Sequence, residues 1–343
     1  MSVIWSPAAT RLSTQELEML QHPHSSGLIL FAYNYENPSQ VKELIDSALA
    51  VNPNIIVSVD QEGGRVQRFL QGMTQLPPAV KLGDLYAADK QQGLQAAYNV
   101  GRLCGMELGE LGINVNYAPV LDVSHGISQV IGDRSYADKV AVVVAVAAAY
   151  TDGLQDAGVL AVGKHFPGHG GVAADSHEIL PYDERSSSAI ATDAEAFTRI
   201  LPKIKAVMTG HIVFPEVDDK AVTFSQHWLQ KKLREEMSYQ GVVISDDLSM
   251  MAAKDLYADA ASATIAALNA GCDYVLLCND VAGAAGVLDK LEESGHPVAD
   301  EHIRKLLQAV SVPIEDSGEG SGDGLASRFD LEQARDLCRR MCQ

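Results

Sequence analysis

Residues 159–171 read Val-Leu-Ala-Val-Gly-Lys-His-Phe-Pro-Gly-His-Gly-Gly, a short apolar run that opens into a glycine-rich loop. An apolar run of this length, bounded by glycine, is typical of a buried strand. The first polar side chains after it, Lys164 and His165, stand at the carboxyl end of that predicted strand. The same arrangement recurs along the chain, and the recurrence decides the fold.

Short β-branched or leucine-rich runs alternate with longer segments in which apolar residues recur every three or four positions. The runs are 27–32, 55–59, 115–123, 159–162, 206–208, 242–244 and 274–277, and the amphipathic segments are 94–111, 137–157, 193–204, 225–237 and 259–270. This alternation predicts parallel strands joined by right-handed crossovers. Such strands form either an open doubly wound sheet or a closed barrel.

Polar residues at the ends of the runs favour the barrel. They are Asp60, Asp122, Lys164, His165, His211, Asp246 and Asn279. An open sheet binds ligands at one crevice, whereas a barrel collects side chains from many strands at one mouth. We therefore predict an α/β fold of the (β/α)8 TIM-barrel type, with residues 1–316 as a single catalytic domain. Residues 317–343 are expected to form an acidic Gly/Ser linker and a short C-terminal helix.

Composition limits the possible partners. The 343-residue chain has a formal net charge of −19, which repels phosphate backbones and anionic lipid surfaces, so nucleic acid and membranes are poor partners. No run approaches the ~18 apolar residues of a membrane span, and residues 1–10 lack the features of a signal peptide. The five cysteines form no C-x-x-C pair, and we interpret them as reduced thiols. We expect a cytoplasmic monomer that acts on a small molecule.

The loop that follows residues 159–162 carries the most informative cluster of side chains. His165, His169 and His177 with Asp175 could bind a metal ion, or they could bind sugar hydroxyls and transfer protons. The absence of an H-x-H or H-E-x-x-H pattern and the nearby charge of Lys164 argue mildly against a metal. Asp175 is well spaced to orient His177 and raise its pKa. A loop without catalytic role is the third alternative.

Three glycines, Gly168, Gly170 and Gly171, lie between the strand end and Asp175. Glycine lacks the side chain that restricts the backbone. These positions therefore predict a flexible loop.

Two neighbouring carboxylates end the run 242–244. Strand-end acidic residues often cap the next helix, and Asp247 is better placed than Asp246 to do so. Asp246 is therefore the stronger candidate for a nucleophile that projects into the barrel mouth.

Two further loops supply candidate binding groups. Asp60 precedes a double glycine and can accept hydrogen bonds from vicinal sugar hydroxyls, with Arg68 close by in the sequence. Arg134 lies in a second polar loop. A surface turn around Asp60 and a structural salt bridge at Arg134 remain the alternatives.

Taken together, these stretches resemble the family 3 glycoside hydrolases, and more narrowly the β-N-acetylglucosaminidases (β-N-acetylhexosaminidases) of bacterial cell-wall recycling. The motifs are Asp60-Gln-Glu-Gly-Gly-Arg-Val, Pro119-Val-Leu-Asp-Val, Val130-Ile-Gly-Asp-Arg134, Lys164-His-Phe-Pro-Gly-His-Gly, Asp175-Ser-His177 and Ser245-Asp-Asp-Leu-Ser-Met. The resemblance extends over about residues 27–279, and the motif that begins at Lys164 is its most specific part.

The resemblance implies a retaining exo-glycosidase that removes terminal N-acetylglucosamine from 1,6-anhydro-N-acetylmuramic acid, with or without a stem peptide. It implies roles in peptidoglycan recycling, cell-wall biogenesis, cell division and cell shape. Asp246 would be the nucleophile that forms a glycosyl-enzyme, and His177 with Asp175 would be the acid/base pair. The resemblance assigns the holding of the sugar ring to Asp60, Arg68, Arg134, Lys164 and His165. It implies no metal and no organic cofactor. The competing hypotheses are a zinc-dependent barrel hydrolase and a barrel that binds amino-sugars without turnover.

Overall fold

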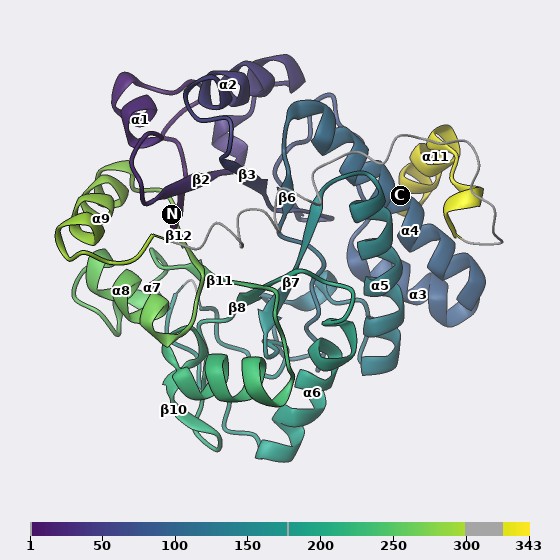
Figure 1. The fold of residues 1–343 in the computed structure, drawn as a ribbon. Helices are drawn as coiled ribbons and strands as arrows, with labels where there is room; N and C mark the ends of the chain where they lie inside the picture. Colours follow the sequence, from purple (N-terminus) through teal and green to yellow (C-terminus); the bar gives the residue numbers. More distant parts are fainter. Residues whose placement is uncertain (1, 177, 299–324) are drawn as a thin grey trace.

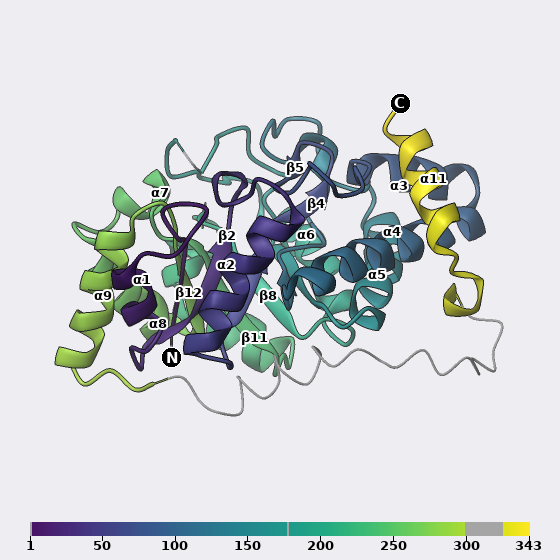
Figure 2. The same ribbon diagram turned by 90° about the horizontal axis from the view of Figure 1, so that it is seen from above.

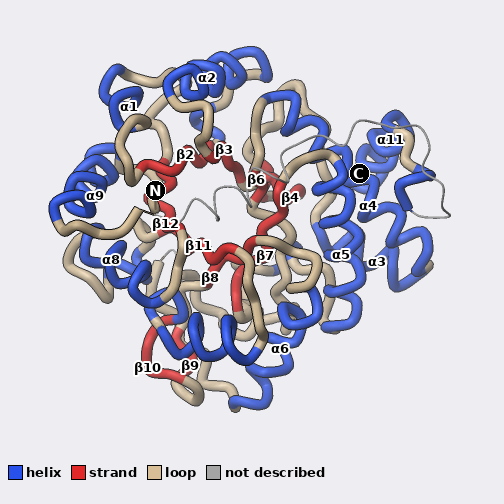
Figure 3. Tube along the Cα trace, in the orientation of Figure 1, coloured by secondary structure: helices blue, strands red, loops and turns tan. Residues whose placement is uncertain are grey.

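The computed structural model describes residues 2–176, 178–298 and 325–343. Eight parallel strands close into a barrel in the order β1-β12-β11-β8-β7-β6-β3-β2, surrounded by helices (Figures 1 and 3). The strands are β1 (Val3–Trp5), β2 (Ser25–Leu30), β3 (Ile56–Val59), β6 (Val115–Asn116), β7 (Leu160–Phe166), β8 (Ala206–Thr209), β11 (Val242–Asp247) and β12 (Tyr274–Leu277). The predicted (β/α)8 barrel is confirmed.

Helices cover the outside of the barrel, and short hairpins lie at its rim. The helices are α1 (Thr14–Met19), α2 (Pro38–Val51), α3 (Ala79–Ala88), α4 (Lys90–Leu111), α5 (Val140–Asp156), α6 (Ser187–Ile200), the π-helix η4 (His227–Glu236), α7 (Met251–Lys254), α8 (Ala260–Ala270), α9 (Val281–Glu293) and α11 (Leu331–Met341). The hairpins pair β4 (Gln61–Gly63) with β5 (Val66–Gln67) and β9 (Val213–Phe214) with β10 (Asp218–Ala221). Within the described residues, no helix combines the length and apolar character needed to cross a membrane.

The barrel interior is filled by side chains from alternate strand positions. It contains Ile4, Ile29, Ile56, Val115, Tyr117, Leu160, Val162, Ala206, Met208, Val242, Ile244, Tyr274, Leu276 and Cys278, all buried. Val243, between two of these, packs instead in the outer core beneath the helices, as the two-residue period of a strand requires. The barrel is therefore a packed core, and a binding site must lie at its mouth.

Irregular pairing at the carboxyl ends of two strands shapes that mouth. The register of β7 against β8 shifts between Gly163 and Phe166, and the register of β11 against β12 shifts between Ile244 and Asp247. A register shift breaks the regular alternation of side chains. Consistent with this, Lys164 and its neighbour His165 both line the same cavity, as do Asp246 and Asp247.

The C-terminal helix α11 packs beside α4 (Figures 1 and 2). The segment before it is also tied to α4. The guanidinium of Arg102 lies 4.8 Å from the ring centre of Phe329, and Gln95 donates a 2.9 Å hydrogen bond to the carbonyl of Leu325. The predicted domain boundary at residue 316 falls outside the described residues.

Candidate active site

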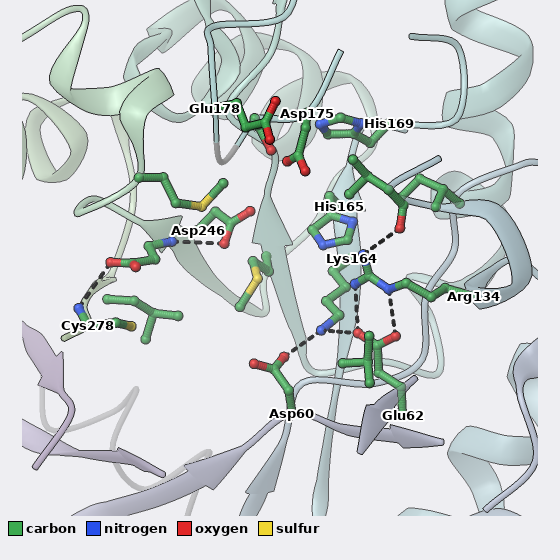
Figure 4. A pocket seen from close by; sticks show the side chains of 18 of the residues that line it. Asp60, Glu62, Arg134, Lys164, His165, His169, Asp175, Glu178, Asp246 and Cys278 are labelled. Carbon is green, nitrogen blue, oxygen red and sulfur yellow. Dashed lines mark hydrogen bonds and ion pairs between the residues drawn. The ribbon is translucent and has the colours of Figure 1, made fainter. Parts of the chain in front are cut away.

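A cavity of about 840 Å³ lies at the barrel mouth, within the size range of small-molecule sites. It brings together the predicted residues Asp60, Arg68, Arg134, Lys164, His165, Asp175 and Asp246. Figure 4 shows Asp246 on one side of this cavity, with Asp175 and His165 across from it. The remaining predicted residue, His177, lies outside the described residues.

One wall of the cavity is a chain of alternating charges. The ammonium of Lys164 lies 2.6 Å from Asp60 Oδ1 and 2.6 Å from Glu62 Oε1. Arg134 forms a two-pronged pair with Glu62, at 2.8 Å through Nε and 2.7 Å through Nη2. Arg68 reaches Asp60 at 3.4 Å. Figure 4 shows Glu62 joining Lys164 to Arg134, so each of the three cations is oriented by a carboxylate before any ligand arrives.

Glu62 is a site residue that the sequence interpretation missed. Burial alone would raise its pKa, but the charges of Arg134 and Lys164 outweigh burial and hold the pKa well below its ordinary value. Gly63 and Gly64, both with positive φ, turn the chain directly after it, and a Cβ at Gly63 would lie 2.4 Å from the carbonyl oxygen of Pro77. A carboxylate directly before a double glycine was the signal that could have identified it.

Asp122 holds His165 in a fixed orientation. Its Oδ2 lies 2.7 Å from His165 Nδ1, while its Oδ1 accepts hydrogen bonds from the backbone N–H groups of His165 (3.2 Å) and His169 (2.7 Å). Burial opposes the charged carboxylate, but the nearby His165 and these hydrogen bonds leave the pKa of Asp122 below its ordinary value. Asp122 was predicted at a strand end without a role, and the structure shows that it orients the histidine.

His169 also lines the cavity, and burial lowers its pKa, which favours the neutral imidazole. Among the described residues, no three His, Cys, Asp or Glu side chains are grouped as a metal site requires. His177, a member of the cluster predicted as a metal alternative, lies outside the described residues.

The two aspartates at the end of β11 have different surroundings. Asp247 accepts hydrogen bonds from Ser249 through its backbone N–H (2.9 Å) and its hydroxyl (2.5 Å), and from the N–H of Cys278 (3.0 Å). Burial raises the pKa of Asp247. Asp246 Oδ1 accepts from the N–H of Asp247 at 2.8 Å. Asp247 thus closes a turn, and the expectation that it caps the next helix is wrong, because the N-cap of α7 is Met250.

The glycines of the loop after β7 serve close packing. A Cβ at Gly170 would lie 1.8 Å from the carbonyl oxygen of Val123, and one at Gly171 would lie 2.0 Å from Nη2 of Arg185. Both glycines are buried. The reason for expecting a flexible backbone is therefore wrong at these two positions.

Known proteins are similar to this chain in both sequence and architecture. The chain matches the model of the glycosyl hydrolase family 3 N terminal domain over residues 1–310. A β-hexosaminidase from Thioalkalivibrio sulfidiphilus is 42% identical over 301 residues, which cover 87% of this chain and 86% of that protein. NagZ from Neisseria gonorrhoeae in complex with N-trifluoroacetyl-D-glucosamine has a TM-score of 0.85 at 33% identity, covering 100% of this chain and 98% of that one. The same protein in complex with a zinc ion gives a TM-score of 0.85, 33% identity and the same coverage.

Proposed function

Because the chain belongs to glycosyl hydrolase family 3, as a β-N-acetylglucosaminidase, we propose that it is a retaining exo-enzyme that uses Asp246 as its nucleophile. The contrast between neighbouring aspartates carries this proposal. Both line the cavity, but the carboxylate of Asp247 accepts hydrogen bonds from Ser249 and Cys278 that close a turn, whereas Asp246 faces Asp175 across the cavity (Figure 4). This arrangement supports Asp246 as the residue that attacks a sugar bound in the cavity.

The proposed reaction has two steps. A carboxylate oxygen of Asp246 attacks the anomeric carbon while His177, oriented by Asp175, gives a proton to the departing oxygen. A covalent glycosyl-enzyme and the free aglycone result. Water then attacks the same carbon, His177 takes its proton, and Asp246 leaves. Two inversions at one carbon retain the β configuration.

The charged wall supports the binding of a sugar. An ammonium group has three N–H donors, and Lys164 directs two of them to Asp60 and Glu62, which leaves one for a sugar hydroxyl. We assign ring binding to Lys164 and the other predicted residues Asp60, Arg68, Arg134 and His165. Groups that are fixed before binding need no reorganisation in the transition state, which lowers the barrier.

We further propose that the substrate is a peptidoglycan fragment with N-acetylglucosamine β-linked to 1,6-anhydro-N-acetylmuramic acid, with or without peptide. The packed barrel interior closes the cavity from below, which suits removal of one sugar from a chain end. We place the activity in the cytoplasm, a compartment that suits cysteines in the thiol form. Cell fractionation tests this placement.

The test uses a chromogenic β-N-acetylglucosaminide and the purified disaccharide, with and without peptide, each with and without a chelator. We expect turnover of both substrates, no effect of the chelator, and the β anomer as first product by NMR. First release of the α anomer would contradict a glycosyl-enzyme. Loss of activity with chelator, restored by zinc, would favour a zinc hydrolase, and binding without turnover would favour a sugar-binding protein.

A further inference from the structure

A cluster of charged side chains lies at the C-terminal end of the loop that joins β7 to α6 and includes two residues of that loop. The loop, residues 167–186, brings Asp175 to the cavity. The cluster consists of His125, Asp183, Arg185 and Asp193, and we call it the Arg185 cluster. None of these four side chains lines the cavity formed by the described residues. The mechanism proposed above gives them no role.

The guanidinium of Arg185 is fixed by two carboxylates. It reaches Asp183 through Nε at 2.9 Å and Nη2 at 2.7 Å, and Asp193 through Nη2 at 2.7 Å. His125 Nε2 lies 3.1 Å from Arg185 Nη1 and 2.9 Å from Asp193 Oδ2. The side chains of Asp183 and Asp193 are 0% and 4% exposed. Two buried carboxylates therefore pair with one guanidinium, which cannot rotate away without breaking both pairs.

The guanidinium of Arg185 occupies the space that a side chain at position 171 would need. A Cβ built there would lie 2.0 Å from Nη2, 2.1 Å from Cζ and 2.5 Å from Nε of Arg185. The φ angle of Gly171 is outside the left-handed region, so backbone conformation does not demand glycine. The requirement comes from Arg185, whose planar group contacts the loop backbone four residues before Asp175.

We propose that Arg185 is a positioning residue that sets the place of Asp175 relative to Asp246. Locked by Asp183 and Asp193, its guanidinium supports the backbone at Gly171. The loop thereby holds Asp175 in its place across the cavity from Asp246. This inference rests on the acid/base role proposed for the loop.

The experiment measures kcat/KM of the full chain on aryl β-N-acetylglucosaminides whose leaving groups range from phenol to 2,4-dinitrophenol. Arg185→Met should lose at least ~10-fold on the phenyl substrate, which needs a proton, and less than ~3-fold on the dinitrophenyl substrate, which does not. Arg199→Met is the matched control, because Arg199 belongs to α6 and, among the described residues, makes only an exposed pair with Glu195. It should leave both rates unchanged.

Gly171→Ala tests the same contact while Arg185 and both carboxylates are still present, and it decides the matter if Arg185→Met does not fold. It should show the same dependence on the leaving group. Arg185→Lys keeps the charge but not the plane, so it should not restore the phenyl rate. Equal losses on all leaving groups in both variants, unchanged rates in both, or full activity in Arg185→Lys would overturn the inference.

Asp175→Ala separates this inference from the proposed function. If Asp175→Ala depends on the leaving group and the Arg185 and Gly171 variants do not, the positioning role is wrong and the acid/base role stands. If Asp175→Ala shows no such dependence, the acid/base assignment itself is wrong.

Discussion

Lys164 and Asp122 show how single residues at this barrel mouth are fixed. Each makes more than one polar contact. Lys164 pairs with Asp60 and Glu62, and Asp122 contacts the ring of His165 and the backbone N–H of His169. Residues at strand ends could be predicted from the sequence because a polar side chain there follows an apolar run. The partners that orient them could not, since Glu62 and Arg134 are 72 positions apart and meet only through the fold.

Replacing the nucleophile should separate catalysis from binding. Asp246→Asn keeps the shape of the side chain and loses the nucleophile, so turnover should fall by at least ~1000-fold on the chromogenic substrate while product still binds, as calorimetry can measure. Asp247→Asn should lower the melting temperature, and its turnover rate should fall much less than that of Asp246→Asn. The opposite pattern, with activity kept in Asp246→Asn and lost in Asp247→Asn, would exchange the two roles.

Glu62→Gln should weaken both the site and the fold. The amide cannot neutralise Arg134 and Lys164, and breaking a buried ion pair costs about 3–5 kcal/mol. We expect a lower melting temperature at pH 7 and a higher KM, with Glu110→Gln, at an exposed position, as control.

The pKa of Glu62 is lowered in the folded state. The stabilisation of the folded protein by this carboxylate is therefore present above the ordinary carboxyl pKa and is lost as pH falls below it. The difference between wild type and variant should therefore shrink in acid, and a constant difference would contradict the charge argument.

At the scale of elements, the sequence predicted seven of the eight barrel strands. The eighth, β1 (Val3–Trp5), is too short for a recognisable period and exists because β12 and β2 pair with its two sides. The run 115–123 was predicted as one strand, yet β6 ends at Asn116. Pro119 lacks the N–H that a continued ladder needs, and the following residues bond to β7 irregularly, as in the 2.6 Å hydrogen bond from the N–H of Leu121 to the carbonyl of Lys164.

Gly170→Ala should destabilise the protein, because the added methyl group meets the carbonyl oxygen of Val123. Overpacking of this kind costs about 1–3 kcal/mol, measurable as a lower midpoint in urea. Gly286→Ala is the matched control, since a Cβ there meets nothing within 4 Å and the residue lies in α9. It should be neutral or stabilising by up to about 1 kcal/mol. Equal midpoints for wild type and Gly170→Ala would show that the loop backbone adapts freely.

At the scale of the whole molecule, the two ends of the barrel have different tasks. The carboxyl ends of the strands carry the cavity, whereas His24, directly before β2, lies buried at the opposite end. His22 and His296 stand close to it, with ring centres 5.9 Å and 6.5 Å away. Because of this separation, His24 can affect the pH dependence of stability without contacting the cavity.

Acid should unfold the protein partly through His24. Burial, together with the nearby charges of His22 and His296, lowers the pKa of His24 from 6.5 to about 4. Between these pH values the unfolded chain binds a proton at His24 that the folded chain does not bind. The free energy of unfolding therefore falls as pH drops from 6.5 towards 4. His24→Gln should flatten the melting temperature across this range while the pH profile of kcat/KM keeps its shape. An unchanged stability profile would remove His24 from the acid response.

The pairing of β1 with β12 has a consequence for synthesis on the ribosome. Val3 lies beside Val275 in the closed barrel. The first strand to be synthesised, β1, therefore cannot complete its pairing until the last strand, β12, has been synthesised. Until then one side of β1 and one side of β11 present unpaired backbone groups, which are templates for wrong association. Chains stalled before residue 274 should therefore be the forms that chaperones bind.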